Sequence, residues 1–498
     1  MATSVVYRGD PGDAPDADED TKAMQNAIEE EIALKRLLGI PGASSMVAGI
    51  MIGSGIFISA RWVLVYSGSV GLGFFVWLLC AVVSFIGGLC WVELGLTFPK
   101  CGGEYILIKE TIGSVPAFSI VWLKIIIVYP SSSAIGLLTF ASYLLEPFFP
   151  GCAKREDLVP VVKLIAAWSM CTICLLNCVS VKWAARVQIV FTAGKFFALA
   201  FLIATGFYSL GQGHTSSFKD SFKGTTTQIG MVGLAFQSGL WAFEGWMHLE
   251  AVSRKKLVAQ SATPRAIPKL LFVFISNIPR ASRTGQLKES PATAVSVAQR
   301  VYGPMMARIL PLFVAASVFG SGNGSLFSYG RVMFSAAREG HLPSFMAMIH
   351  RTQRTPISAM LFRTIFACIL LIPDKSTIQS LISLYSTAEW LTYTVTVVGL
   401  LWTRYKRPEL PRPFKLPIFI PVLFLLISLY LTISPFIKKP LESFISLFLV
   451  LTGIPVYFFF IHFKCTPKCV SAFFEWIAVK TQQVLNVRYP TTVVEIGS

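Results

Sequence analysis

Apolar runs long enough to cross a lipid bilayer recur along this chain, and they constrain its fold more than any other feature. A membrane-spanning helix needs about 20 apolar residues, because it rises about 1.5 Å per residue across a hydrocarbon core of about 30 Å. Only 14% of the residues are charged, whereas soluble domains average about a quarter. The sequence predicts spans at 42–65, 70–97, 117–147, 158–179, 184–210, 227–251, 304–336, 356–373, 379–403, 417–436 and 441–463.

The basic residues lie where membrane orientation requires them. The formal net charge of +17 would by itself suggest a nucleic-acid ligand. Lys and Arg concentrate instead in short connections between apolar runs, and alternate connections are the richer ones. The positive-inside rule then predicts a disordered cytosolic N-terminal tail at 1–39 and a cytosolic C-terminal tail at 466–498. The richer connections contain Lys35, Lys100, Lys182, Arg338, Arg351 and Arg404.

The stretch between Ser253 and Tyr302 departs from this pattern. Its longest clean apolar run is Leu270–Ile278, which as a helix would rise only about 13 Å. Without a crossing here, the basic connections that follow would fall on the outside, against the positive-inside rule. We therefore expect a short or tilted helix over about 264–280.

Glycines interrupt the first apolar run. Gly49, Gly53 and Gly55 lie close together within Val47–Ile58. A membrane helix can open its backbone hydrogen bonds only where protein or a water-filled cavity satisfies the freed groups. A broken apolar helix of this kind is typical of the substrate site of a transporter. The alternative interpretation is a small-residue face for helix packing.

The sixth predicted helix contains a second candidate break. Its segment Gly239–Trp246 holds Glu244, followed directly by Gly245. A carboxylate in lipid costs a few kcal/mol, so Glu244 should face a cavity or a cationic partner. Helices one and six occupy corresponding positions if two five-helix halves form an inverted repeat. Packing alone remains the alternative for the aromatic side chains of Trp241, Phe243 and Trp246.

Several motifs, in this order along the chain, resemble one known family. Gly53-Ser54-Gly55-Ile56-Phe57 is similar to the GSGIF motif of the L-type amino acid transporters, the light chains of heteromeric exchangers in the amino acid–polyamine–organocation superfamily. The resemblance runs from about residue 35 to 465 and is nearest the cystine/dibasic and aromatic-preferring branches. It also rests on Glu93–Gly95, Gly102–Tyr105, Pro130–Ser132, Val181-Lys182, Gly320–Ser325, Arg338–Pro343, Arg407–Leu410 and Gly453–Phe458.

This resemblance implies an all-α polytopic membrane protein with a 5+5 inverted-repeat broken-helix fold. It has about twelve transmembrane helices, of which the seventh is short or defective in this chain. The transporter domain would cover 40–465, with repeat one at about 42–210 and repeat two at about 227–403. Two extra helices would follow at about 417–463. Substrate would bind between broken helices one and six.

The resemblance also implies roles for residues at the two breaks. Ser54 and Gly55 would bind the substrate carboxylate, while the backbone around Trp241-Ala242-Phe243 would receive the α-amino group. Trp241 would close over the bound amino acid. Amide donors suit the anion, and carbonyl ends and a ring face suit the ammonium. The expected substrate-binding residues are Ile52, Gly53, Ser54, Gly55, Trp241, Ala242, Phe243, Glu244, Gly245 and Glu389.

Two acidic residues set this chain apart within the resemblance. The cystine/dibasic branch has aspartate where this chain has Glu244, and Glu389 adds an acid where the pocket of relatives is usually neutral. The hypothesis is that both glutamates favour cationic or large polarisable side chains over acidic ones. For Glu389, an ion pair with a basic residue of the bundle is the alternative.

Lys195 lies inside the fifth predicted span, about 16 Å deep by helix rise. It matches the lysine that takes the place of a sodium ion in sodium-independent relatives. By that resemblance it would bridge the broken helix to Ser321 or its neighbours on helix eight. The alternative is a lysine that snorkels to the membrane interface.

Cys152 is the exception among cysteines that otherwise lie mostly inside apolar runs. It falls in the predicted outside connection after helix three, where the compartment is oxidising and a lone cysteine suggests an intermolecular disulfide. In the resembling family, the cysteine at this place bonds a single-pass glycoprotein heavy chain. A free thiol is the alternative.

Taken together, the sequence predicts a sodium-independent amino acid antiporter of the plasma membrane that works by alternating access. Large neutral, aromatic and also cationic amino acids are the expected substrates. The alternative is a non-transporting or decayed form that keeps the fold but lacks a full helix seven. No nucleophile–base pairing or metal motif indicates an enzyme, and we expect no cofactor, no metal and no nucleic-acid partner.

Overall fold

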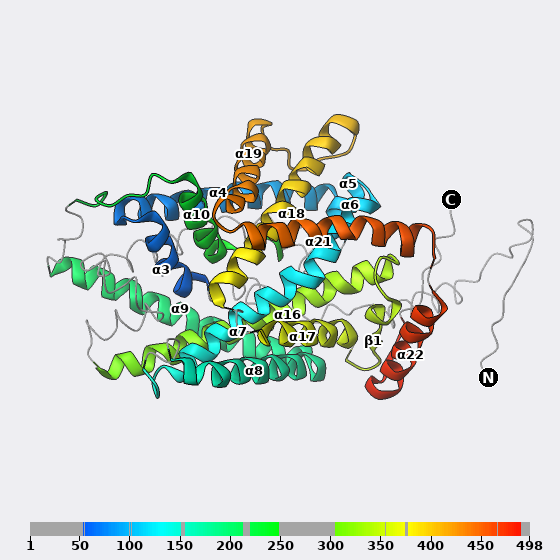
Figure 1. Cartoon of the computed structure of the whole chain (residues 1–498), viewed down its shortest axis with the longest axis horizontal. Coiled ribbons are helices and arrows are strands. Elements are labelled where there is room, and N and C mark those ends of the chain that lie inside the picture. The colour runs from blue at the N-terminus through cyan, green and yellow to red at the C-terminus, as the bar shows by residue number, and fades with distance from the viewer. Residues whose placement is uncertain are drawn as a thin grey trace, which may run out of the picture.

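A computed structural model describes residues 53, 55–98, 100, 102–150, 155–212, 220–248, 304–353, 355–373, 377–465 and 467–489. Helices make up most of these residues, and most of the long ones run roughly along the longest axis of the molecule (Figure 1). The expected segment over 264–280, the N-terminal tail and Cys152 lie outside the described residues, as do Ile52 and Ser54.

All the regular elements in the first half of the described chain are helices. Its first helix, α3, starts at the glycine of the predicted break, and Ser69 caps α4 by accepting a hydrogen bond from the Leu72 amide at 3.3 Å. The elements are α3 (Gly55–Ser67), α4 (Val70–Thr97), α5 (Gly103–Thr111), α6 (Ser114–Leu123), η1 (Lys124–Val128), α7 (Tyr129–Leu145), η3 (Glu156–Leu158), α8 (Val159–Val179), α9 (Val181–Gly211), α10 (Ile229–Phe243) and η5 (Trp246–His248).

The second half adds helices and one small sheet. Strands β1 (Ile349–His350) and β2 (Val487–Arg488) pair antiparallel, with Ile349 opposite Arg488. The helices are α16 (Pro304–Arg338), η7 (Ser344–Ala347), α17 (Ile357–Leu371), α18 (Ile378–Lys406), α19 (Phe419–Ile433), α20 (Pro435–Lys438), α21 (Pro440–Val456), η8 (Tyr457–His462) and α22 (Lys468–Leu485).

The membrane spans predicted from apolar runs agree well with these helices. Within the described residues, seven helices are long and apolar enough to cross a membrane: Val70–Thr97, Ser114–Leu145, Glu156–Val179, Lys182–Phe201, Arg308–Arg338, Phe419–Lys438 and Pro440–His462. The shorter apolar helices α3, α10 and α17 occupy three further predicted spans. The chain is therefore an all-α polytopic membrane protein.

One helix lies where the sequence predicted only a connection. The chain turns at Gly102 (φ 147°) and Gly103 (φ 59°), conformations that favour glycine, and then forms α5. Most of α5 is buried, including the side chains of Glu104 and Tyr105. The expectation of a connection without a helix was wrong, because burial of this short segment comes from helices distant in sequence.

A π-helical segment, η1, joins α6 to α7 within the third predicted span. In a π-helix each carbonyl accepts a hydrogen bond from the amide five residues later, one residue further than in an α-helix. The half of the span after η1 is therefore rotated relative to the half before it. Lys124 is its first residue and Tyr129 follows its last.

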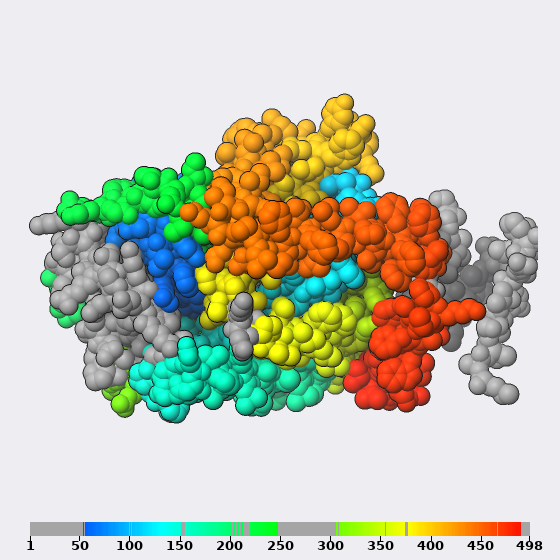
Figure 2. All heavy atoms as spheres, viewed as in Figure 1, coloured from blue at the N-terminus to red at the C-terminus, as the bar shows by residue number. Residues whose placement is uncertain are grey.

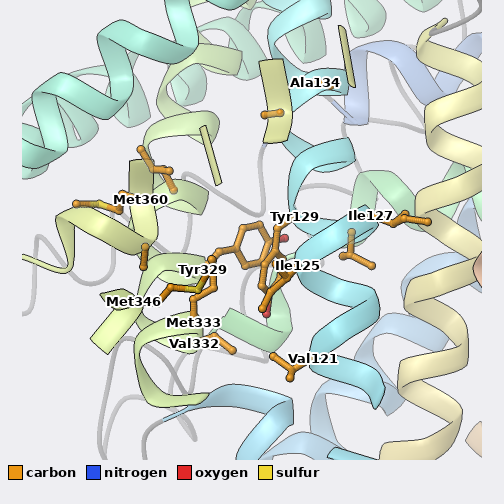
Figure 3. Close-up of a cluster of buried hydrophobic side chains, with 14 of the residues drawn as sticks. Val121, Ile125, Ile127, Tyr129, Ala134, Tyr329, Val332, Met333, Met346 and Met360 are labelled. Carbon is orange, nitrogen blue, oxygen red and sulfur yellow. The ribbon is translucent and has the colours of Figure 1, made fainter. Parts of the chain in front are cut away.

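The interior divides into two clusters of apolar side chains. One joins α3, α4 and α10 with α18 and α19, and the other joins α5, α6 and α7 with α8, α16 and α17. In the second cluster Tyr129 of α7 stacks on Tyr329 of α16, with ring centroids 4.1 Å apart (Figure 3). Apolar side chains are also exposed on the outer faces of helices such as α8, α19 and α21, as lipid contact requires; α21 lies across the face shown in Figure 2.

Candidate functional site

The sixth predicted helix is broken where its sequence indicated. Helix α10 ends at Phe243, and Glu244 follows in an extended conformation with φ −65° and ψ 165°. Gly245 has φ 110°, which a residue with a side chain rarely adopts, and the short helix η5 then begins at Trp246. The second break is thus confirmed, and the last carbonyl groups of α10 lie beside Glu244.

The start of α3 lies against this break. A Cβ on Gly55 would come within 2.6 Å of the Cα of Ala242 and 2.8 Å of the carbonyl oxygen of Trp241. Only glycine allows such an approach of two backbones. The positive N-terminal end of α3 therefore lies next to the negative C-terminal end of α10.

A cavity of about 60 Å³ lies where these two ends meet. One water molecule needs roughly 10–15 Å³ of such space, so the cavity holds a few water molecules or a small polar group. Besides α3 and α10, helices α7, α8, α16 and α18 and the short helix η5 contribute to its wall. The lining residues are Gly53, Gly55, Ser132, Ser133, Gly136, Leu137, Met170, Trp241, Glu244, Gly245, Met247, Val318, Ser321, Gly322, Ser325, Tyr329 and Tyr385.

Trp241 forms part of the cavity wall. Its ring meets that of Tyr385 edge to face, with centroids 4.6 Å apart. The indole Nε1 is buried without a hydrogen-bond partner in the described part of the chain. A ring held by one aromatic contact, with a donor still available, can close over a ligand and bind it.

The other aromatic residues of this segment pack in the core. Phe243 contacts Trp77 at a centroid distance of 5.7 Å, and Trp246 meets Trp91 at 4.8 Å and Tyr393 at 5.0 Å. Neither Phe243 nor Trp246 lines the cavity, and nor does Ala242, whose backbone contacts Gly55. Packing therefore accounts for the two aromatic side chains, but not for Trp241.

Lys195 is buried, with only 1% of its surface exposed. Its Cε lies 3.7 Å from the position that a Cβ would take on Gly320 of α16. This places the lysine beside Gly320, and the next residue of α16, Ser321, lines the cavity. Such burial disagrees with a lysine that snorkels to the interface.

A comparison with known proteins identifies the family of this chain. The model of the amino acid permease family matches residues 38–460, which is most of the sequence. The chain belongs to the amino acid permease family. Membership agrees with a polytopic helical fold whose cavity lies where the start of α3 meets the break after α10.

Relatives of this permease along most of its length carry transporter names. The human large neutral amino acids transporter small subunit 2 is 38% identical over 477 residues, covering 94% of this chain and 88% of the relative. The mouse Asc-type amino acid transporter 1 is 38% identical, covering 93% and 88%. The human b(0,+)-type amino acid transporter 1 is 37% identical, covering 90% and 92%. These similarities support amino acid transport by the permease.

Glu389 occupies a different place in the permease from the one that the sequence suggested. It does not line the cavity; its Oε1 accepts a hydrogen bond from Lys124 Nζ at 3.0 Å. Lys124 also pairs with Glu104 of α5, and all three side chains are at most 5% exposed. The geometry thus favours the ion-pair alternative for Glu389.

Sequence reasoning missed Lys124, although its position inside an apolar run was visible. It also missed Arg363 of α17, which is 2% exposed. The Nη2 of Arg363 donates to Ser133 Oγ at 2.5 Å, and its guanidinium lies 4.5 Å from the centroid of the Tyr329 ring. Ser133 and Tyr329 both line the cavity. The rule that marked Glu244, a charge within an apolar run, would have marked both cations.

Proposed function

We propose that this chain is a sodium-independent amino acid antiporter that works by alternating access. The observation that carries the proposal is the contact of Gly55 with the backbone of Trp241 and Ala242 at the edge of a cavity. It brings the amide end of α3 and the carbonyl end of α10 to a single site. A zwitterion is the ligand that such a pair of opposite dipole ends would bind.

Each end of the substrate then has its own partner. The N-terminal amides of α3, with Ser54, bind the carboxylate. The last carbonyls of α10 accept hydrogen bonds from the ammonium, and the ring of Trp241 covers it. Lys195, beside Gly320 of α16, takes the place of a coupling sodium ion.

Glu244 and the aromatic wall set the substrate class. The rings of Trp241, Tyr329 and Tyr385 line the cavity and supply apolar contacts to a large neutral or aromatic side chain. Glu244 adds a carboxylate that attracts a cationic side chain and repels an acidic one. Since Lys124 already neutralises Glu389, Glu244 is the glutamate that carries this preference.

We further propose that the chain is the light chain of a disulfide-linked heterodimer at the plasma membrane, with both termini in the cytosol. Support comes from Cys152 in a predicted outside connection and from a relative named as a small subunit. A Cys152→Ser variant should migrate as a single chain under non-reducing conditions, whereas the native chain runs with its heavy chain.

A non-transporting family member is the second candidate. The short apolar run Leu270–Ile278 favours it, because a helix of that length does not cross a hydrocarbon core of about 30 Å. Surface-exposed chain without amino acid flux would establish this alternative.

The deciding experiment is exchange in cells that co-express a heavy chain. Cells are loaded with labelled phenylalanine, surface delivery is confirmed, and efflux is followed with and without external amino acid. We expect external amino acid to stimulate efflux, and Trp241→Ala to abolish the stimulation. Trp402→Ala is the matched control, since Trp402 is exposed and does not line the cavity. Normal surface delivery with no stimulated efflux from the native chain would refute the exchanger.

Competition among substrates tests the role of Glu244. Hydrogen bonds to charged groups contribute about 1.5–3 kcal/mol, or roughly 10–100-fold in affinity. Glu244→Gln should therefore weaken inhibition by lysine by about tenfold or more, while inhibition by phenylalanine changes little. Glu409→Gln, at an exposed position, should change neither. Preferential inhibition of the native chain by glutamate would contradict the assignment.

A further inference from the structure

The C-terminal helix α22 has two apolar faces. One face packs inward: Ala478 is buried, and Phe474, Ile477 and Leu485 lie against the second interior cluster. The other face is open. Phe473, Trp476 and Val484 are 56%, 59% and 77% exposed. A helix docked to its own protein on one side therefore leaves a second apolar surface uncovered.

The exposed residues form one stripe along the helix. At about 100° per residue, Cys469, Phe473, Trp476, Lys480 and Val484 fall within a narrow sector, and all of them are exposed. Phe473 and Trp476 stack with centroids 6.5 Å apart. We call these five residues the α22 stripe. It combines large apolar side chains with a lysine long enough to keep its charge in water.

The position of α22 in the chain brings it to the bilayer surface. The last apolar span ends at His462, and α22 begins at Lys468. Six residues reach at most about 20 Å, so the helix starts close to the membrane. Figure 1 shows α22 at one end of the bundle, lying steeply across the direction of α21. A helix that leaves the membrane and runs across its normal lies along the interface.

Contacts with the rest of the protein fix the orientation of the stripe. Strand β2, directly after α22, pairs with β1, and the ring of Phe474 stacks on Phe345 of η7 at 6.3 Å. The hydroxyl groups of Tyr489 and Ser344 lie 3.2 Å apart. These contacts hold the inward face, so the α22 stripe points away from the protein.

The charges around α22 indicate which lipids it meets. Basic residues outnumber acidic ones over 464–489. The basic residues are Lys464, Lys468, Lys480 and Arg488, and the acidic residue is Glu475. Basic groups beside an apolar stripe favour anionic headgroups, and Trp and Phe favour the depth at which headgroups meet acyl chains.

We propose that the α22 stripe rests in the headgroup region of an anionic bilayer leaflet and is a lipid-binding surface of this protein. The bilayer covers the face that the protein leaves open, while β1 and η7 hold the opposite face. The inference goes beyond the proposed exchange of amino acids and does not depend on it.

Quenching of Trp476 fluorescence by brominated lipids tests this placement. The full chain with its heavy chain is reconstituted in bilayers of phosphatidylcholine and phosphatidylserine, brominated either near the headgroups or near the bilayer centre. The difference between the native chain and Trp476→Phe isolates the signal of Trp476. We expect stronger quenching by bromine near the headgroups. No quenching of Trp476 by either lipid would overturn the proposal.

A second tryptophan calibrates the depth. Trp168 is exposed in the middle of α8, a candidate membrane span. The difference in quenching between the native chain and Trp168→Phe isolates the signal of Trp168, which should be quenched by bromine near the bilayer centre. A Trp476 signal with the same depth as that of Trp168 would place α22 within the core and contradict an interfacial helix.

The charge contribution has its own readout. Replacing phosphatidylserine by phosphatidylcholine should reduce the Trp476 quenching severalfold, and Lys468→Gln with Lys480→Gln should remove that dependence on phosphatidylserine. Equal quenching of the native chain in both bilayers would overturn the preference for anionic lipid. None of these measurements requires transport, so their failure is separate from failure of the proposed exchanger.

Discussion

Two buried cations of this permease lie in very different surroundings. Lys124, at the start of η1, pairs with Glu104 of α5 and Glu389 of α18. Arg363 of α17 forms no ion pair within the described residues; a hydroxyl, a carbonyl and an aromatic ring surround it. Its Nε and Nη1 atoms are buried without a hydrogen-bond partner in that part of the chain.

The difference separates Lys124, whose charge stabilises the fold through ion pairs, from Arg363, whose buried charge brings no comparable gain in stability. Removing one member of a buried ion pair leaves an uncompensated charge and costs about 3–5 kcal/mol, while replacing a whole set by apolar groups is often neutral. Lys124 of η1 joins α5 and α18 through its ion pairs with the carboxylates of Glu104 and Glu389. Arg363 joins α17 to Ser133 at the cavity wall, yet keeps a desolvated charge that a methionine would not carry.

The largest effect should follow Lys124→Met. It leaves Glu104 and Glu389 buried together without a cation, which should lower stability by about 3–5 kcal/mol. Thermal unfolding of the detergent-purified protein measures this loss. Lys480→Met on the exposed face of α22 is the matched control. If both variants unfold at the same temperature, Lys124 does not hold its three elements together.

Removing the whole charged set should recover most of that loss. In Lys124→Met combined with Glu104→Gln and Glu389→Gln no charge remains at the site, so the triple variant should unfold well above Lys124→Met. The three substitutions share contacts and are expected to be strongly non-additive. A triple variant as unstable as the sum of its single changes would refute the assignment.

An intermediate effect is expected for Ser133→Ala. The Ser133 hydroxyl accepts the shortest hydrogen bond of Arg363, at 2.5 Å, and a bond to a charged group contributes about 1.5–3 kcal/mol. The same thermal unfolding assay measures it. In an Arg363→Met background the substitution should cost much less; an equal cost in both backgrounds would show that Arg363 is not the partner that matters.

The smallest change in stability is expected for Arg363→Met. Loss of the contacts with Ser133 and Tyr329 offsets removal of an unpaired buried charge, so stability should change by only about 1 kcal/mol in either direction. Amino acid exchange, measured on the same variant, should fall, because Ser133 and Tyr329 of the cavity wall lose the cation that contacts both of them. A destabilisation as large as that of Lys124→Met would remove the distinction between the two sites.

Much of this architecture could be predicted from the sequence because membrane burial is a local property. Apolar runs predicted the spans, and an acid followed by glycine predicted the break at Glu244-Gly245. Helix α5 was missed, since Gly102-Gly103 indicates a turn and the burial of most of α5 depends on distant helices. The partner of Glu389 could not be predicted either: Lys124 lies 265 positions earlier, and only the tertiary fold brings them together.

The number of residues in the π-helical turn between α6 and α7 sets the rotation of α7, whatever the apolar residues in that turn are. One extra residue in the turn rotates everything after it by about 100° relative to a continuous α-helix. Lys124 at its start therefore points to the glutamates, while Ser132, Ser133 and Gly136 beyond it reach the cavity. Deleting a single apolar residue from 125–128 would rotate α7 about its axis relative to α6. The sequence of α7 would be unchanged, but different α7 side chains would line the cavity.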